Sequence, residues 1–147
     1  MSIRNQIQTD LTAAMRSGDN LRKRTLRMAL AAIKLADIEK GVPLDDPAIV
    51  SVIQKEIKSH RESIADAERA GRPDLVAEAD AEIGVLESYL PSQLSPAELE
   101  ALARSAIAEV GATSQKEMGQ VMKALMPRLQ GQAEGSQVSQ LVRRLLG

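Results

Sequence analysis

Apolar residues recur every three or four positions along most of the chain, and this spacing predicts helices rather than strands. In the first segment Ile3, Ile7 and Leu11 fall on one face of a helix that Gly18 would end. Glycines and prolines divide the rest of the chain into further segments of the same kind. Seven helices are predicted, at about residues 2–17, 20–40, 47–70, 73–90, 96–110, 116–126 and 135–146. We therefore expect an all-α protein.

The clearest boundary lies in the stretch YLPSQLSP, residues 89–96, where two prolines interrupt the helical pattern. Directly after it, Ser95 to Glu98 matches a capping box with Pro at the first helical position. We expect a four-helix N-terminal bundle over residues 1–90, followed by a small three-helix C-terminal domain over residues 91–147. A domain of about fifty residues barely stabilises itself, so the second is expected to lean on the first or on a partner.

The predicted helix 20–40 is apolar on two faces. One face carries Leu21, Met28, Ala32 and Leu35, and the other carries Leu26, Leu30 and Ile33. A helix of this kind usually packs between partners on both sides, so both faces are expected to be buried. Asp46 is expected to be the N-cap of the third helix. The fourth helix is expected to bury Leu75.

Methionines at four-residue spacing mark the sixth predicted helix, at Met118, Met122 and Met126. Methionine fills irregular cores, but it is also frequent on adaptable binding surfaces. The apolar stripe that contains them is about 140° wide, which suits a face turned to the core. Pro127 is expected to end or kink this helix, and Ser114 to Glu117 matches a second capping box.

The inventory of reactive side chains is small. The chain contains no cysteine and one histidine, His60, which excludes disulfides, thiolate metal sites and a cysteine nucleophile. His60 is expected to make a hydrogen bond between helices, and acids such as Glu78 and Glu82 are expected on solvated faces. We therefore predict no catalytic residue, no cofactor and no metal site.

The N-terminal segment is amphipathic and charged and has no apolar stretch of signal-peptide length. No segment is long and apolar enough for a membrane span. A cytoplasmic protein that does not contact membranes is the prediction from these two features.

The net charge is −1, but basic residues gather locally on the second predicted helix. Lys23, Arg24, Arg27 and Lys34 fall within an arc of about 100°. A basic stripe of this kind is typical of phosphate contact, although it could also be a solubilising face that pairs with acids of a neighbouring helix. The residues predicted to bind nucleic acid are these four and, as secondary candidates, Lys116, Lys123, Arg143 and Arg144.

A set of motifs lies in order along the chain: LRMALAAIKLADIEKG at 26–41, QKEIKSHRESI at 54–64, AGRPDL at 70–75, EIGVLESYLPSQLS at 82–95, and EMGQVM at 117–122 followed by Pro127 and the loop 131–135. Taken together, they resemble the YqeY-like (GatB/YqeY) family. The resemblance implies an all-α fold in two helical parts. It also implies kinship with the tail domain of the B subunit of the tRNA-dependent Asp/Glu amidotransferase, which contacts tRNA.

On this resemblance the chain is expected to be a stand-alone module that binds tRNA or a protein of the translation and aminoacylation machinery, without chemistry of its own. The label of carbon–nitrogen ligase with glutamine as amido-N-donor would then belong to the larger complex. The loop carries Gln132 and Glu134 where the family pattern has a cation and an aspartate, which argues against phosphate contact there. Two alternatives stay open: a protein-interaction adaptor with a Met-rich corner, and an accessory activity of amidotransferase type. The sequence leaves the oligomeric state open.

Overall fold

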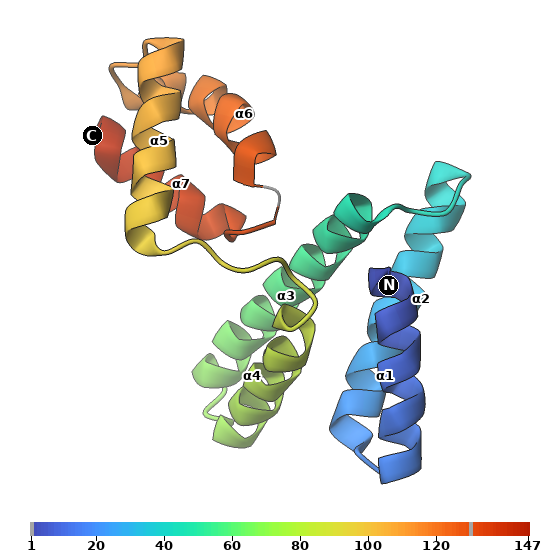
Figure 1. The fold of residues 1–147 in the computed structure, drawn as a ribbon. Helices are drawn as coiled ribbons and strands as arrows, with labels where there is room; N and C mark the ends of the chain where they lie inside the picture. Colours follow the sequence, from blue (N-terminus) through green and yellow to red (C-terminus); the bar gives the residue numbers. More distant parts are fainter. Residues whose placement is uncertain (1, 130) are drawn as a thin grey trace. The chain divides into compact units, whose positions relative to one another are not determined.

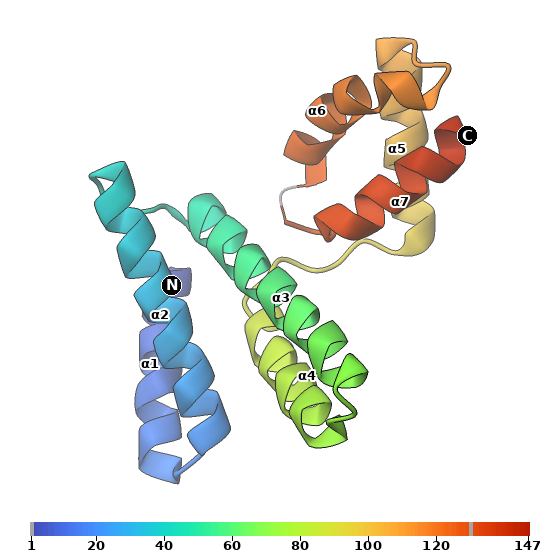
Figure 2. The same cartoon turned by 180° about the vertical axis from the view of Figure 1, so that it is seen from behind.

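The computed structural model describes residues 2–129 and 131–147, and over these residues it contains seven α-helices, one short 3₁₀ turn and no strand. The all-α prediction is therefore confirmed. The chain divides into two compact units, Met1–Leu90 and Pro91–Gly147 (Figures 1 and 2). That each unit folds as a separate domain stays a prediction. No helix in the described ranges has the length and apolar character that crossing a membrane would need.

The first unit consists of two helical hairpins (Figure 1). They are formed by α1 (Ile3–Ser17) with α2 (Asn20–Lys40) and by α3 (Asp46–Arg69) with α4 (Pro73–Glu87). Gly18 and Gly41 end the first two helices in the left-handed conformation, with φ of 75° and 83°, which glycine adopts without steric cost. The N-cap of α3 is Asp45 rather than Asp46, because the Asp45 side chain accepts a hydrogen bond from the Ala48 N–H.

The core of the first unit is almost entirely aliphatic. Its buried residues are Ile7, Leu26, Ala29, Ile33, Ile49, Ile53, Ile57, Ile83, Leu86 and Tyr89. Helix α2 contacts α1, α3 and α4, and it turns Leu26, Ala29 and Ile33 inward.

The prediction that both apolar faces of α2 are buried is wrong. Met28 and Leu35 are 48% and 59% exposed, because α2 turns Leu26, Ala29 and Ile33 into the core instead. Leu75, at the start of α4, is likewise exposed rather than buried.

The second unit packs three helices around a separate core. The helices are α5 (Pro96–Val110), α6 (Met118–Leu129) and α7 (Gly135–Leu146), and each contacts the other two. The predicted capping box at Ser95 and Glu98 is confirmed, with both reciprocal hydrogen bonds present. The buried residues are Leu99, Ala103, Ala106, Val121, Leu125, Leu129, Ala133, Val138 and Val142.

The expected cap of the sixth helix at Ser114 and its expected end at Pro127 are both wrong. Ser114 makes no side-chain cap; a 3₁₀ turn, Gln115–Glu117, follows it, and Glu117 accepts hydrogen bonds from Thr113 instead. The helix also continues through Pro127 to Leu129. Pro127 lies in the last turn, where its missing N–H removes one hydrogen bond near an end that is already incomplete.

Candidate functional site

The exposed side of α2 carries the predicted cations Lys23, Arg24, Arg27 and Lys34. Arg24, Arg27 and Lys34 are exposed and Lys23 is half-buried. The helix begins after Asp19, whose side chain accepts a hydrogen bond from the Arg22 N–H and so fixes the first turn. The opposite side of α2 is held in the core, so the basic side faces outward.

Arg24 differs from the other three cations because it is bound to helix α4. Its guanidinium donates to Glu78 at 2.5 Å and to Glu82 at 3.2 Å. Within the described ranges no ion pair engages Lys23, Arg27 or Lys34. Arg24 therefore joins two helices, while the positive charges of the other three are available to a ligand. That these residues bind nucleic acid stays a prediction.

Glu82 lies at the centre of a polar contact among three helices. It is 8% exposed, and its second oxygen lies 2.7 Å from Nε2 of His60. Nδ1 of His60 lies 2.7 Å from the carbonyl oxygen of Glu56. Both partners accept hydrogen bonds, so the ring donates from both nitrogens when it carries two protons. As expected, His60 makes contacts between helices, and neither nitrogen is directed at a hydroxyl nucleophile.

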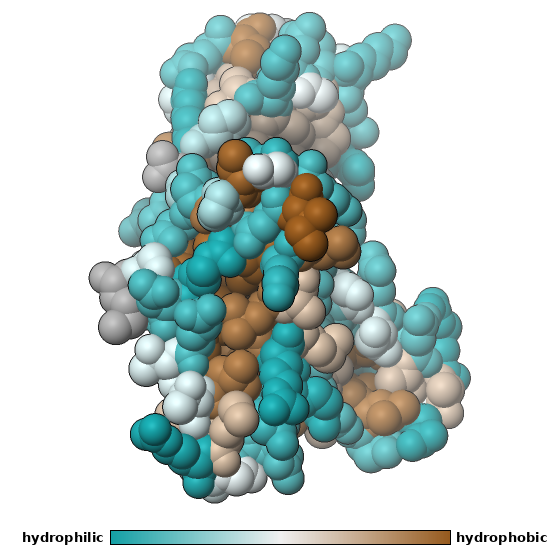
Figure 3. Space-filling model, turned by 90° about the vertical axis from the view of Figure 1, so that its right-hand side faces the viewer, coloured by the Kyte–Doolittle hydropathy of each residue, from teal (hydrophilic) through white to brown (hydrophobic). Residues whose placement is uncertain are grey.

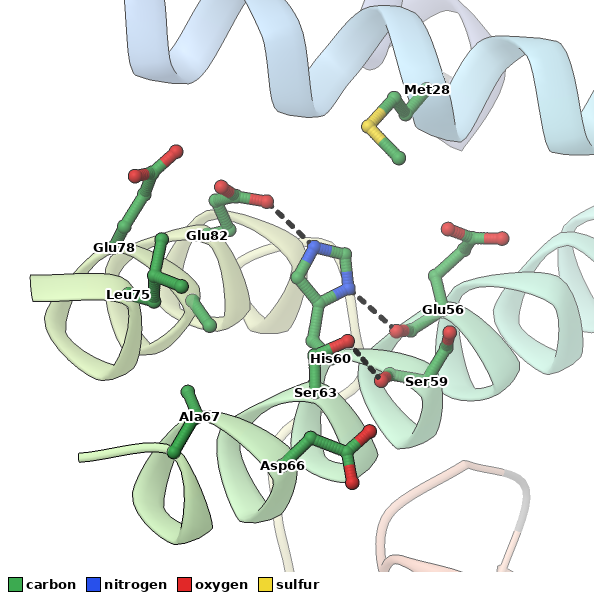
Figure 4. Close-up of a pocket in the computed structure, with 12 residues that line it drawn as sticks. Met28, Glu56, Ser59, His60, Ser63, Asp66, Ala67, Leu75, Glu78 and Glu82 are labelled. Carbon is green, nitrogen blue, oxygen red and sulfur yellow. Dashed lines mark hydrogen bonds and ion pairs between the residues drawn. The ribbon is translucent and has the colours of Figure 1, made fainter. Parts of the chain in front are cut away.

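A cleft of about 550 Å³ opens above this contact, between α2, α3 and α4. Figure 4 shows Met28 on one side of the cleft and His60, Leu75, Glu78 and Glu82 around it. Within the described ranges no three His, Cys, Asp or Glu side chains are placed to hold a metal ion. The cleft is lined by apolar side chains, two serines and four acids. Two of these acids, Glu78 and Glu82, already bind Arg24, and Glu82 also binds His60.

Two further contacts fix α1 in the first unit. Tyr89 donates to Asp10, and burial, followed by this hydrogen bond, raises the pKa of Tyr89 to about 12. Arg4 forms a double hydrogen bond with Asp37, which also accepts from the Leu44 N–H. The Arg4 guanidinium holds the pKa of the Asp37 carboxyl below its ordinary value. These contacts hold helices together and do not form a reaction site.

The secondary candidates Lys116, Lys123, Arg143 and Arg144 all lie exposed in the second unit. The Gln115 side chain donates to the carbonyl oxygen of Arg143 at 3.4 Å. The segment with Lys116 is therefore next to the last turn of α7, where two arginines also complement the helix dipole. Lys123 lies on α6.

The Met-rich corner offers only a small surface. Met118 and Met122 are half-buried, and Met126 is 37% exposed. Val121, Leu125 and Leu129 form the buried side of the same helix.

Sequence reasoning missed Glu82 as a buried residue. The one feature of the sequence that indicates its burial is its position on the helix. Glu82 lies beside Ile83 and three residues after Ala79, and both of these residues are on the buried face of α4. An acid at such a position needs a partner from another element. The partners, His60 and Arg24, are 22 and 58 residues away in sequence.

The profile of the family described as Yqey-like protein matches residues 4–146. Among curated relatives, altered inheritance of mitochondria protein 41 of Pyrenophora tritici-repentis is 33% identical over 146 residues, which is 97% of this chain and 80% of that protein. The protein of the same name in Kluyveromyces lactis is 39% identical over 56% of this chain. Its counterpart in Lachancea thermotolerans is 34% identical over 71%. The matched regions span 45% and 57% of these two relatives, about half of their length.

All three relatives are named as mitochondrial proteins, and this finding contradicts the prediction of a cytoplasmic protein. The prediction rested on the lack of an apolar leader. Mitochondrial targeting segments are amphipathic and basic rather than apolar, so that lack does not distinguish the two compartments.

Proposed function

The chain belongs to the YqeY-like family, and from that premise we propose that it is a helical module that binds tRNA through the phosphate backbone, without chemistry of its own. The observation that supports the proposal is the state of Lys23, Arg27 and Lys34. They lie on one side of α2, and within the described ranges no acid neutralises them.

Phosphate contact is the interaction that such a side chain arrangement favours. Each cation that approaches a phosphate releases condensed counterions, and this release supplies affinity that does not depend on base sequence. The chain as a whole has a charge of −1, so the binding must come from a local group of cations. The resemblance to the tail domain of the tRNA-dependent amidotransferase B subunit makes tRNA the first nucleic acid to test.

Arg24 has a different role in this proposal. Its guanidinium is shared between Glu78 and Glu82, and releasing it to a phosphate would leave Glu82 with one partner fewer in the cleft. It is a positioning residue that holds α2 against α4, so we leave it out of the proposed phosphate contacts.

The test is a binding titration of the full chain with bulk tRNA at two salt concentrations. Three phosphate contacts predict a loss of affinity of roughly 20- to 40-fold for a fourfold rise in salt. Replacing Lys23, Arg27 and Lys34 together by Ala is expected to remove most of the binding at low salt and to flatten the salt dependence.

The matched control replaces Arg16, Lys55 and Lys58 by Ala. This variant loses the same charge from exposed positions of the first unit outside α2, and it is expected to keep its affinity to within a few-fold. No binding at low salt, or an equal loss in both variants, would contradict the proposal.

A further inference from the structure

Helix α2 exposes a line of apolar residues beside its cations. Met28, Leu35 and Ile38 are 48%, 59% and 71% exposed, and Ala31 between them is exposed as well. Seen from the side on which the α1–α2 hairpin lies, apolar side chains reach the surface among hydrophilic ones (Figure 3). Single exposed apolar residues are ordinary, whereas a contiguous group marks a contact surface. We call Met28, Ala31, Leu35 and Ile38 the α2 seam.

The spacing of the α2 seam is that of a coiled coil. The four residues follow one another at intervals of three, four and three, which are the a and d positions of two heptads. This line is separate from the buried face of α2, which carries Leu26, Ala29 and Ile33. The seam is therefore not needed for the core of the first unit, and its spacing fits another helix.

We propose that the α2 seam joins two copies of this chain as a short, parallel, two-stranded coiled coil. The charges beside the seam support a second copy as the occupant. Lys34 lies at position g of the heptad that begins at Met28, and Glu39 lies at position e of the following heptad, which begins at Leu35. In a parallel pair the g residue of one helix faces the following e residue of the other. Lys34 of each copy then faces Glu39 of the second copy, and this attraction occurs twice.

The antiparallel arrangement lacks this complementarity. Pairing the same four residues antiparallel places Met28 opposite Ile38 and Ala31 opposite Leu35. The g positions then face one another, so Lys34 of one copy would lie against Lys34 of the second copy. Like charges at this distance are unfavourable, and the parallel arrangement is preferred.

The ends of the seam are also defined by the structure. One heptad step before Ala31 the d position is occupied by Arg24, which is bound to Glu78 and Glu82. At the other end α2 stops at Lys40 and Gly41. The seam is thus about 16 Å long at 1.5 Å per residue. An interface of this length is small and belongs to the weak, concentration-dependent class.

The first experiment uses the absence of cysteine from the chain. In a parallel pair Ile38 faces Ile38 of the second copy, so the Ile38→Cys variant is expected to form a disulfide-linked dimer under mild oxidation. Met15→Cys is the matched control, because Met15 is 52% exposed but lies on α1. In the antiparallel pair position 38 faces Met28, so Ile38→Cys would not cross-link.

The second experiment measures the dimer dissociation constant by sedimentation equilibrium, without nucleic acid. Leu35→Glu is expected to raise the constant at least about tenfold, since it places two charges in the seam, whereas Met15→Glu is expected to leave it unchanged. Lys34→Glu alone is expected to weaken the dimer, and Lys34→Glu with Glu39→Lys is expected to restore it.

Three results would overturn the proposal: a monomer at every concentration, cross-linking of Ile38→Cys no greater than that of Met15→Cys, or no restoration in the double charge exchange. A further measurement applies if the chain is monomeric. If adding an acidic amphipathic helical peptide then slows hydrogen exchange at the α2 seam, the dimer proposal fails and the seam binds another protein. No RNA is present, so these results do not depend on tRNA binding. Lys34 is common to both proposals, so phosphate contact by the dimer would rest on Lys23 and Arg27.

Discussion

The cores of the two units differ in the chemistry of their buried side chains. The first unit buries two polar residues, Thr25 and Glu82, among its aliphatic side chains, whereas every buried residue in the described part of the second unit is apolar. Thr25 bonds the Leu21 carbonyl of its own helix, while Glu82 bonds side chains of two other helices.

Because of this difference, the two units fix the positions of their helices in different ways. Aliphatic packing alone is tolerant of small shifts between long helices. The hydrogen bonds of Glu82 to His60 and Arg24 have fixed directions, so they specify one register between α2, α3 and α4. In the second unit the small buried residues Ala103 and Ala106 pack α5 against its neighbours. An ion pair between helices there, Arg128 with Glu109, lies on the surface rather than in the core.

The largest expected effect comes from a cavity in the apolar core. Leu125→Ala is expected to destabilise the second unit by about 2–5 kcal/mol, because Leu125 is fully buried. A unit of this size has roughly 3–9 kcal/mol of stability in total. Chemical denaturation followed by circular dichroism reports the loss, and Met126→Ala at the exposed neighbouring position is the control.

The same variant also tests whether the units unfold separately. Tyr89 is the only aromatic residue of the chain, and it lies in the first unit. Its fluorescence is therefore expected to show an unchanged transition in Leu125→Ala. If circular dichroism and tyrosine fluorescence shift together, the two units unfold as one.

A smaller effect is expected from breaking the polar contact of the first unit. Glu82→Gln keeps the shape of the side chain but removes the charge that faces His60 and Arg24, and we expect a loss of about 1–3 kcal/mol. The tyrosine fluorescence transition measures it. Glu78→Gln is the matched control, because Glu78 binds the same Arg24 from an exposed position and is expected to cost less than about 1 kcal/mol. Equal losses would show that burial of Glu82 contributes nothing to register.

The smallest effect is seen only in alkali. The pKa of Tyr89 is raised to about 12 in the folded protein, from an ordinary value of 10.0. The contribution of Tyr89 to the free energy of unfolding is therefore fully present below pH 10 and is lost as the pH rises towards 12. The absorbance of tyrosinate follows this single residue.

Asp10→Asn sharpens that measurement. It is expected to lower the pKa of Tyr89 by removing the carboxylate, while burial, the larger cause, keeps it above 10. A native titration near pH 10 in both proteins would refute the buried hydrogen bond.

Local signals predicted the helices well because their causes are local. Gly18, Gly41 and Gly111 end helices in the left-handed conformation, and the Ser95–Glu98 capping box begins one. Each of these devices acts within about one turn of the chain, so sequence alone reveals it. The error at Ser114 shows the limit, since Glu117 bonded Thr113 in place of the cap.

The sequence by itself determined the all-helical class, the helix ends and the angular position of the four cations on α2, because helix geometry follows from the spacing of neighbouring residues. Only the tertiary structure decided that Arg24 is bound by Glu78 and Glu82, that Glu82 is buried against His60, and that Leu35 remains exposed. These outcomes depend on which helices contact α2 and on which side, and that choice is made by the packing of segments far apart in the chain.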